Sequence, residues 1–222
     1  MIPLEQEPAF ALHRKPYKEN NYLIDIFSLN FGLFRASARI QQKKTHRKTN
    51  NYAPFLLLQI SGQRKGELAS LWQAEVQYDF TPRPARLLHA HYLNEILLGL
   101  LPPDDPAPTV FHQYLLALQR VDAPALRQFE YTLLTHLGLL PEVAHYAEFY
   151  QLDFNDDIAI LRPDSCGYNG QNLERLLHHD PDWQNPETRQ LLQSLIHFYS
   201  QRRADTKRTA VALRQLLHKD RT

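Results

Sequence analysis

Six cationic side chains lie within fourteen residues near the start of this 222-residue chain. The segment "RASARIQQKKTHRK" covers residues 35–48 and contains no carboxylate. Its cations are Arg35, Arg39, Lys43, Lys44, Arg47 and Lys48. Clustered Lys and Arg side chains bind phosphate groups, and exposed aromatic side chains stack on unpaired bases. The cluster therefore fits either a nucleic-acid surface or a solvated basic loop.

The local sequence pattern predicts where the cations of this cluster lie relative to one another. "LFRASARI" is typical of a strand, and alternation along a strand places Arg35 and Arg39 on the same face. The other four cations are expected on the loop that follows. This half of the chain also supplies aromatics, most of which are expected in the core: Tyr17, Tyr22, Phe27, Phe34, Tyr52 and Phe55.

The positive charge is local. The whole chain carries a formal net charge of only +1, but residues 1–80 hold 11 Lys and Arg against 7 Asp and Glu, and the remainder holds 14 against 17. A single cysteine, Cys166, excludes an internal disulfide and a multi-cysteine zinc site. No signal peptide is evident and the longest apolar stretches are too short to span a bilayer. We expect a cytoplasmic protein with no membrane partner.

Two further cationic features have competing interpretations. A C-terminal cluster fits a solvated helical face better than a site: Arg202, Arg203, Lys207, Arg208, Arg214, Lys219 and Arg221. Arg127, in "ALRQFEYTLL", could grip a peptide carboxylate or simply pair with Glu130 three residues later. The residues alone favour the ion pair.

Catalytic and metal-binding patterns are missing. The spacings of His89 with His91 and of His178 with His179 place no two imidazoles on one helix face, so no metal or cofactor is expected. With seven glycines, the chain has no nucleotide-binding loop and no nucleophile elbow. Asp104 and Asp105 resemble turn carboxylates more than magnesium ligands. The sequence therefore argues against an enzyme.

The elements that must position these residues fall into two groups. Up to residue 80 the pattern predicts five short strands, the first led in by "AFALH" and broken at Pro16, which indicates a small barrel or sandwich. Helical periodicity then predicts helices over residues 85–101, 109–121 and 124–138. Two or three more are expected at the end of the chain, over 171–179, 186–203 and 206–219. Residues 142–170 are irregular and fit a hairpin or an extended excursion. We expect an α+β protein, with a β domain over residues 1–81 and an α-helical domain over 82–222.

Several segments in order resemble the RecO family of bacterial recombination mediators. The first, "AFALHRKPYKENNYLIDIFSLNFGLFRASARI", contains a Leu-His-x-x-Pro-Tyr start and an Arg-bearing strand. "APFLLLQISGQRKGELASLWQAE", "YLNEILLGLLPPDDP" and "FHQYLLALQ" follow, and "ALRQFEYTLLTHLGLLP" carries the family's Leu-Arg-x-Phe-Glu. The resemblance covers residues 9–141 well and the last fifty residues weakly.

This resemblance implies a function without catalysis. It implies an N-terminal OB-fold barrel that binds single- and double-stranded DNA, followed by an α-helical bundle. It implies annealing of complementary strands and, with RecR, loading of RecA onto strands coated with single-stranded-DNA-binding protein (SSB). The implied DNA surface is the segment from Arg35 to Lys48, and Arg127 becomes a candidate for binding the acidic, Phe-ending SSB tail. A nucleoid-associated location follows from the same resemblance.

One departure from the family is plain, and two other functions stay open. Many relatives have a four-cysteine zinc module where this chain has "AEFYQLDFNDDIAILRPDSCGYNG", so we expect no zinc. The barrel could instead serve a protein-interaction adaptor that does not bind DNA. A nuclease using Asp104 and Asp105 is the third hypothesis.

Overall fold

The computed structural model describes residues 2–17, 21–39, 52–141, 143, 146–155, 158–178 and 180–219, of which 203–219 as backbone only. The chain forms two compact units, residues 1–122 and 123–222, which are described separately below. The domain boundary predicted at residues 81–82 lies inside the first unit, where strands give way to helices.

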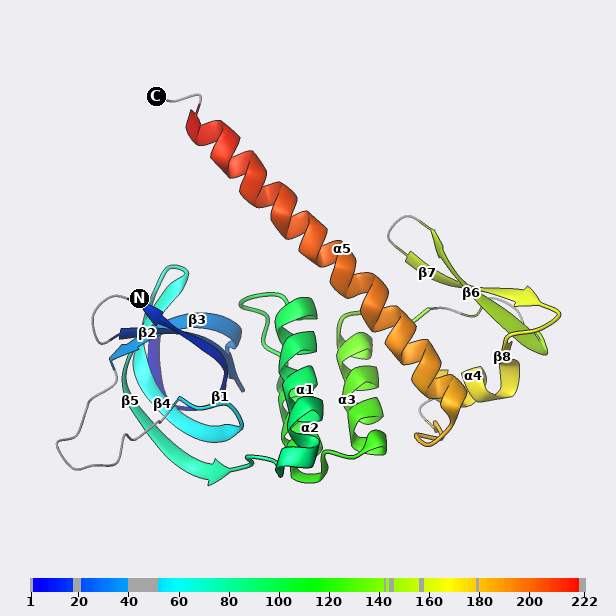
Figure 1. Cartoon of the computed structure of the whole chain (residues 1–222), viewed down its shortest axis with the longest axis horizontal. Coiled ribbons are helices and arrows are strands. Elements are labelled where there is room, and N and C mark those ends of the chain that lie inside the picture. The colour runs from blue at the N-terminus through cyan, green and yellow to red at the C-terminus, as the bar shows by residue number, and fades with distance from the viewer. Residues whose placement is uncertain are drawn as a thin grey trace. The chain divides into compact units, whose positions relative to one another are not determined.

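A closed five-stranded barrel forms the start of the first unit (Figure 1). Its strands are β1 (Ile2–Tyr17), β2 (Asn21–Ser28), β3 (Gly32–Arg39), β4 (Leu56–Lys65) and β5 (Leu68–Asp79). The order around the barrel is β1-β2-β3-β5-β4, and the β3–β5 pair is parallel while the other pairs are antiparallel. The predicted α+β class and five-stranded, OB-like barrel are confirmed.

Strand β1 is longer than the sequence predicts. Pro16 does not break it, because β1 pairs with β4 only as far as Phe10 and beyond that point pairs with β2 alone. A proline has no N–H to donate and is tolerated where one edge of the strand has no partner. The prediction of a break at Pro16 was therefore wrong.

The inward side chains of all five strands fill the barrel, among them Ile24, Ile26, Leu58 and Ile60, none of which is exposed. Each strand alternates, so the opposite face of each strand points away from this core. What covers the outer face decides which part of the barrel is available for binding.

Helices cover one end of the outer face. After the short 3-10 helix η1 (Pro84–Arg86) come α1 (Leu87–Leu100) and α2 (Pro108–Arg120). Phe10 and Phe27 are cross-strand partners that point outward, and the rings of Phe111 and Tyr114 in α2 pack against them at centroid distances of 5.0–6.1 Å. This aromatic layer buries both faces of β1 and β2 at this end.

A buried polar pair fixes α1 and α2 to the barrel. The Asn94 side-chain amide donates to the Leu12 carbonyl at 3.0 Å, and the Tyr114 hydroxyl donates to the Asn94 side-chain oxygen at 2.6 Å. Burial raises the pKa of Tyr114 well above its usual value, so the hydroxyl keeps its proton. The helices are thereby fixed in register on β1.

Gly32 allows the loop after α1 to approach the barrel. Its φ is +64°, and a Cβ there would overlap the backbone carbonyl of Asp105. The backbone of Asp104 donates to the Leu33 carbonyl at 2.9 Å, and Arg64 pairs with the Asp104 carboxylate at 2.5 Å.

We predict that Gly32→Ala lowers the free energy of unfolding by roughly 2–4 kcal/mol, because it combines backbone strain with overpacking. Gly66 has a similar φ of +67° but open space around it, so Gly66→Ala isolates the strain and should lose about 1 kcal/mol. Urea unfolding of the two variants measures the difference. Equal losses would contradict the close approach.

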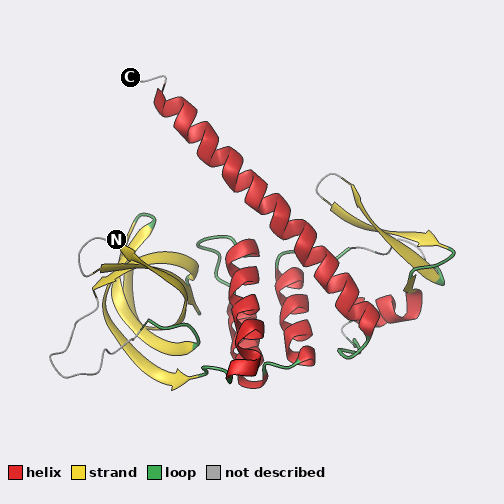
Figure 2. Ribbon diagram, in the orientation of Figure 1, coloured by secondary structure: helices red, strands yellow, loops and turns green. Residues whose placement is uncertain are grey.

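The second unit contains helices and a small sheet (Figure 2). Helix α3 (Ala123–His136) comes first, and strands β6 (Phe149–Asn155), β7 (Ile158–Asp164) and β8 (Tyr168–Asn169) form an antiparallel sheet in the order β7-β6-β8. Of the two interpretations of residues 142–170, the hairpin is the one the described residues adopt, as β6–β7.

The last two predicted helices are one. Helix α4 (Gly170–Leu177) is capped by the Asn169 side chain, and α5 runs without interruption from Pro186 to Lys219. Of the two or three helices predicted for the end of the chain, two form, and residues 204–205 do not interrupt α5 because no Pro or Gly stands there to end the helix. In the described part of the chain, no helix combines the length and apolar character needed to cross a membrane.

Candidate nucleic-acid interface

The far end of the barrel's outer face brings polar and cationic side chains into rows across four strands. In one row the pairing register aligns His13, Asp25 and Arg35 with Leu68, and in the next Lys15, Leu23 and Ser37 with Ser70. A third row aligns Tyr17, Asn21 and Arg39. Cross-strand partners on one face lie about 5 Å apart, so each row is a continuous strip.

Arg35 and Arg39 both project from this outer face, as the alternation predicts. They differ in their partners. The Nε of Arg35 pairs with the Asp25 carboxylate at 3.1 Å, and Nδ1 of His13 lies 3.4 Å from the other oxygen of the same carboxylate. Part of the Arg35 charge is therefore compensated within the protein.

Trp72 completes the third row. The parallel register ends with Ala38 paired to Leu71, and Arg39 and Trp72 are the next residues of β3 and β5 after this last pair. Trp72 lies at a bulge in β5 and its side chain is 66% exposed, which is unusual for a residue of that size. An arginine between an exposed indole and Tyr17 can contact a phosphate while the rings stack on bases. We call Tyr17, Arg39 and Trp72 the stacking row.

Most of the aromatics named from the sequence are core residues, as expected. Phe27, Phe34, Tyr52 and Phe55 are buried, and burial raises the pKa of Tyr52 to about 12. Tyr17 is exposed. The sequence reasoning missed Trp72, which follows the last residue of the parallel β3–β5 ladder on β5, as Arg39 does on β3. Its only local signal is the alternation of "LASLW" along β5.

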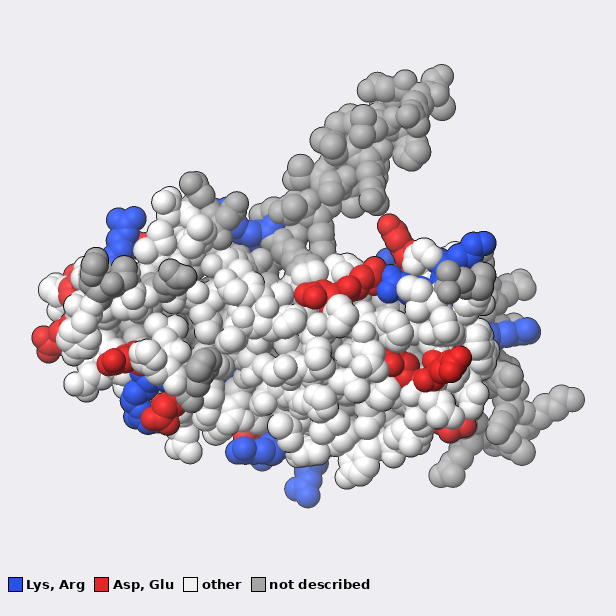
Figure 3. Space-filling model, turned by 180° about the vertical axis from the view of Figure 1, so that it is seen from behind, with Lys and Arg blue, Asp and Glu red and all other residues white. Residues whose placement is uncertain are grey.

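The remaining predicted cations are not placed. Lys43, Lys44, Arg47 and Lys48 lie outside the described residues, and of the C-terminal cluster only the Arg202 side chain is described, over the Phe198 ring at 4.9 Å. Figure 3 shows one face of the molecule, on which the coloured Lys and Arg side chains are interspersed with Asp and Glu. The described residues on that face form no continuous basic field.

Arg127 is buried on α3. It is 5% exposed and pairs with the fully buried Glu130 at 2.7 Å, the i,i+3 contact that the residues alone favoured. Its Nε and Nη1 are buried and have no hydrogen-bond partner among the described residues. The structure thus brings Arg127 together with Glu130, and its role in binding SSB stays a prediction.

The two acids of the nuclease hypothesis hold the loop described above. The Asp104 carboxylate is bound by Arg64, and the Asp105 carbonyl rests against Gly32. Among the described residues, no three His, Cys, Asp or Glu side chains are grouped so that they could hold a metal ion. Both observations give these acids structural contacts.

Comparison with known proteins places the chain in a family. Two family models match, "Recombination protein O N terminal" over residues 1–80 and "Recombination protein O C terminal" over residues 82–209. The chain belongs to the RecO family. The junction of the two RecO models coincides with the end of β5, where the barrel gives way to helices.

Similar proteins carry the name DNA repair protein RecO. The relative from Cellvibrio japonicus is 33% identical over 172 residues, which cover 74% of this chain and 68% of the relative. The relative from Tolumonas auensis is 37% identical over 158 residues, 67% of this chain and 65% of its own length. The relative from Alkalilimnicola ehrlichii is 40% identical over 137 residues, which cover 60% of this chain and 54% of the relative. The chain therefore spans about half to two thirds of the length of these RecO relatives.

Proposed function

We propose that this chain is a DNA-binding recombination mediator that acts in DNA repair without catalysis. The observation that carries the proposal is the stacking row, which lies at the end of β3 from which the basic segment continues. Membership of the RecO family and the printed name of its relatives, DNA repair protein RecO, support the repair role.

The row suggests how complementary strands would be annealed. Two single strands repel each other, and cations presented to both lower that repulsion. Arg39, Lys15 and the cations from Lys43 to Lys48 would hold phosphates, while Trp72 and Tyr17 would hold bases exposed for pairing. SSB-coated strands would be the substrate, and RecR and RecA the partners through which annealing leads to recombination.

Binding of the SSB tail is the finer part of the proposal. Arg127 supports it because Nε and Nη1 keep donor capacity that a peptide carboxylate could use. The tail would have to reach a side chain that is almost fully buried. Anisotropy of a labelled acidic peptide ending in Phe tests this, with Arg127→Lys as the variant that keeps the charge but loses the fork. Equal affinity of both proteins would reject a bidentate contact.

Annealing of SSB-coated oligonucleotides by the purified protein tests the function directly. Faster duplex formation than in its absence is expected, with the rate falling as salt is raised. If the protein shifts neither single- nor double-stranded DNA at low salt yet binds the SSB tail peptide, the adaptor hypothesis replaces this one.

Trp72→Ala is predicted to weaken binding of a fluorescent single-stranded oligonucleotide about tenfold, because stacking of one base contributes roughly 1–3 kcal/mol. Trp72→Phe keeps a ring and should retain most of the affinity. The large exposed fraction of the indole predicts an unfolding free energy within about 0.5 kcal/mol of the wild type. Wild-type affinity in Trp72→Ala would remove Trp72 from the interface.

A further inference from the structure

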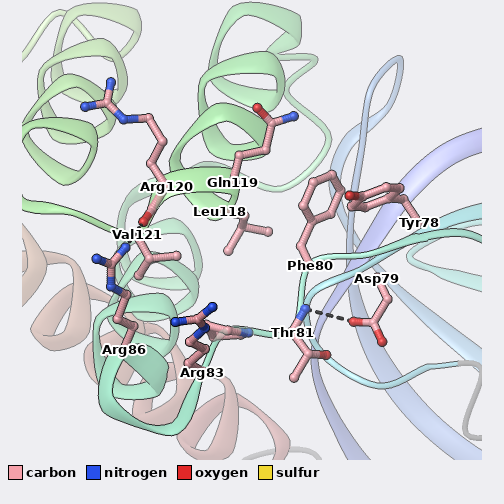
Figure 4. Close-up of a pocket in the computed structure, with 11 residues that line it drawn as sticks. Tyr78, Asp79, Phe80, Thr81, Arg83, Arg86, Leu118, Gln119, Arg120 and Val121 are labelled. Carbon is pink, nitrogen blue, oxygen red and sulfur yellow. Dashed lines mark hydrogen bonds between the residues drawn. The ribbon is translucent and has the colours of Figure 1, made fainter.

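A cavity of about 490 Å³ lies in the first unit where β5 leads into the helices (Figure 4). Its lining comes from the chain between Tyr78 and Arg86 and from the C-terminal end of α2, residues 118–121. We call it the β5–α2 pocket. Its size is ordinary for a small-molecule site, and neither the sequence motifs nor the stacking row accounts for it.

One wall of this pocket is aromatic. The rings of Tyr78 and Phe80 lie side by side at a centroid distance of 4.4 Å. Phe80 also packs against the buried Phe10 at 6.2 Å, and its N–H donates to the Phe55 carbonyl at 3.0 Å, so the base of this wall is anchored in the core. Tyr78 packs on Phe80 and is 59% exposed, so one face of its ring is open to a ligand and held in position.

The opposite wall carries guanidinium groups. Arg120 pairs with Asp122 at 3.1 Å, and Arg86 donates to the Arg120 carbonyl, so these two are partly engaged. Arg83 is exposed and makes no ion pair with any described residue. Its backbone is set between Pro82 and Pro84, with φ −59° and ψ 151°, and a residue before proline is held in this extended form. The Arg83 side chain is thus exposed on a fixed backbone and available to bind an anion.

The pocket also contains an opposing charge. The Asp79 carboxylate accepts the Thr81 N–H at 2.8 Å, and hydrogen bonds from the Thr81 side chain and backbone lower the pKa of Asp79. This acid is therefore ionised at neutral pH and repels any anion that enters. Asp79 therefore serves as a control, because removing its charge should strengthen the binding of an anion in the pocket.

We propose that the β5–α2 pocket binds one nucleotide of single-stranded DNA, with its base on Tyr78 and its phosphodiester on Arg83. This inference rests on the proposed function: the bound DNA strand would continue from the stacking row to this pocket. Trp72 in the stacking row and Tyr78 are both exposed on β5, and the six steps from Trp72 to Tyr78 span about 20 Å. A strand of DNA lying along β5 thus connects the two sites, and this continuity favours DNA over an acidic peptide.

Four variants and a crosslink test the site with a fluorescent oligothymidine. Arg83→Ala should bind about eightfold more weakly at 0.05 M salt and lower the log–log salt slope by about 0.7, the value for one phosphate of a single strand. Tyr78→Ala should lose about fivefold or more, whereas Tyr78→Phe keeps the ring and its affinity. Asp79→Asn keeps the acceptor for the Thr81 N–H and should bind about threefold more tightly.

A photoactivated 5-iodouracil oligonucleotide should crosslink to Tyr78 or Phe80, identified by mass spectrometry of the digested complex. Wild-type affinity and slope in both Arg83→Ala and Asp79→Asn, or crosslinks confined to other residues, would overturn the pocket while leaving the proposed function standing. A wild-type protein that binds no oligonucleotide would overturn both. Arg83-dependent binding of an acidic peptide, with oligonucleotide binding unchanged, would reassign the pocket to a protein ligand.

Discussion

Replacing Lys43, Lys44, Arg47 and Lys48 together by alanine is expected to reduce single-stranded DNA affinity by roughly several thousandfold at 0.05 M salt. Each phosphate contact on a single strand contributes about 0.7 to the log–log salt slope, so four lost contacts make the slope shallower by about 3. The effect is large because the release of counterions from the DNA, which does not depend on the nucleotide sequence, supplies most of the affinity of such an interface. Titrations of a fluorescent oligonucleotide at several salt concentrations measure both quantities.

A charge-matched control separates this surface from net charge alone. Arg162, Arg175, Arg189 and Arg202 are exposed cations of the second unit, outside the proposed interface, and replacing all four by alanine removes the same total charge. This control should lower affinity only slightly, because long-range effects are screened beyond about 10 Å. Equal losses in the two quadruple variants, or none in either, would reject residues 43–48 as phosphate contacts.

Arg127→Met is expected to lower the free energy of unfolding by about 3–5 kcal/mol. The change removes the guanidinium that lies 2.7 Å from Glu130 and leaves a fully buried carboxylate without this counter-charge. Chemical denaturation of the variant beside the wild type measures the loss. The expected loss is the same whether or not Arg127 also binds a peptide, so stability and peptide affinity have to be read separately.

The double variant Arg127→Met, Glu130→Leu is the matched control. Apolar replacement of both members of a buried ion pair is often neutral or stabilising, so the double variant should recover most of the lost free energy. A single variant as stable as the wild type would show that the pair is not desolvated. A double variant as unstable as the single one would show that Arg127 acts through contacts other than Glu130.

Paired charges change how the basic segment is to be understood. Arg35 satisfies the sequence prediction of an outward cation, yet it shares the Asp25 carboxylate with His13. Arg39, two rows away, pairs with Asn21, and its row also contains Tyr17. We therefore expect Arg39→Ala to weaken DNA binding more than Arg35→Ala, a difference that the sequence spacing of the two residues does not reveal.

Local patterns in the sequence were enough to predict most strands and helices. Period-two alternation predicted β2, β3 and the shared face of Arg35 and Arg39, and three- and four-residue spacing predicted α1, α2 and α3 within a few residues. These predictions hold because alternation and helical periodicity are set by covalent geometry over neighbouring residues. The resemblance to the RecO family, carried by short ordered motifs, could also be recognised before any coordinates.

Which strands and helices pack together could be seen only in the folded protein. Arg39 and Trp72 directly follow the last pair of one ladder because β3 and β5 pair in parallel, although 28 residues separate Arg39 from Leu68. Pro16 stays within β1 because the strand has only one partner there. The spacing of Arg127 and Glu130 predicts their ion pair, but its burial depends on the residues that pack around it. Pairing and burial depend on contacts between distant parts of the chain, and their free energies are absent from any local stretch of sequence.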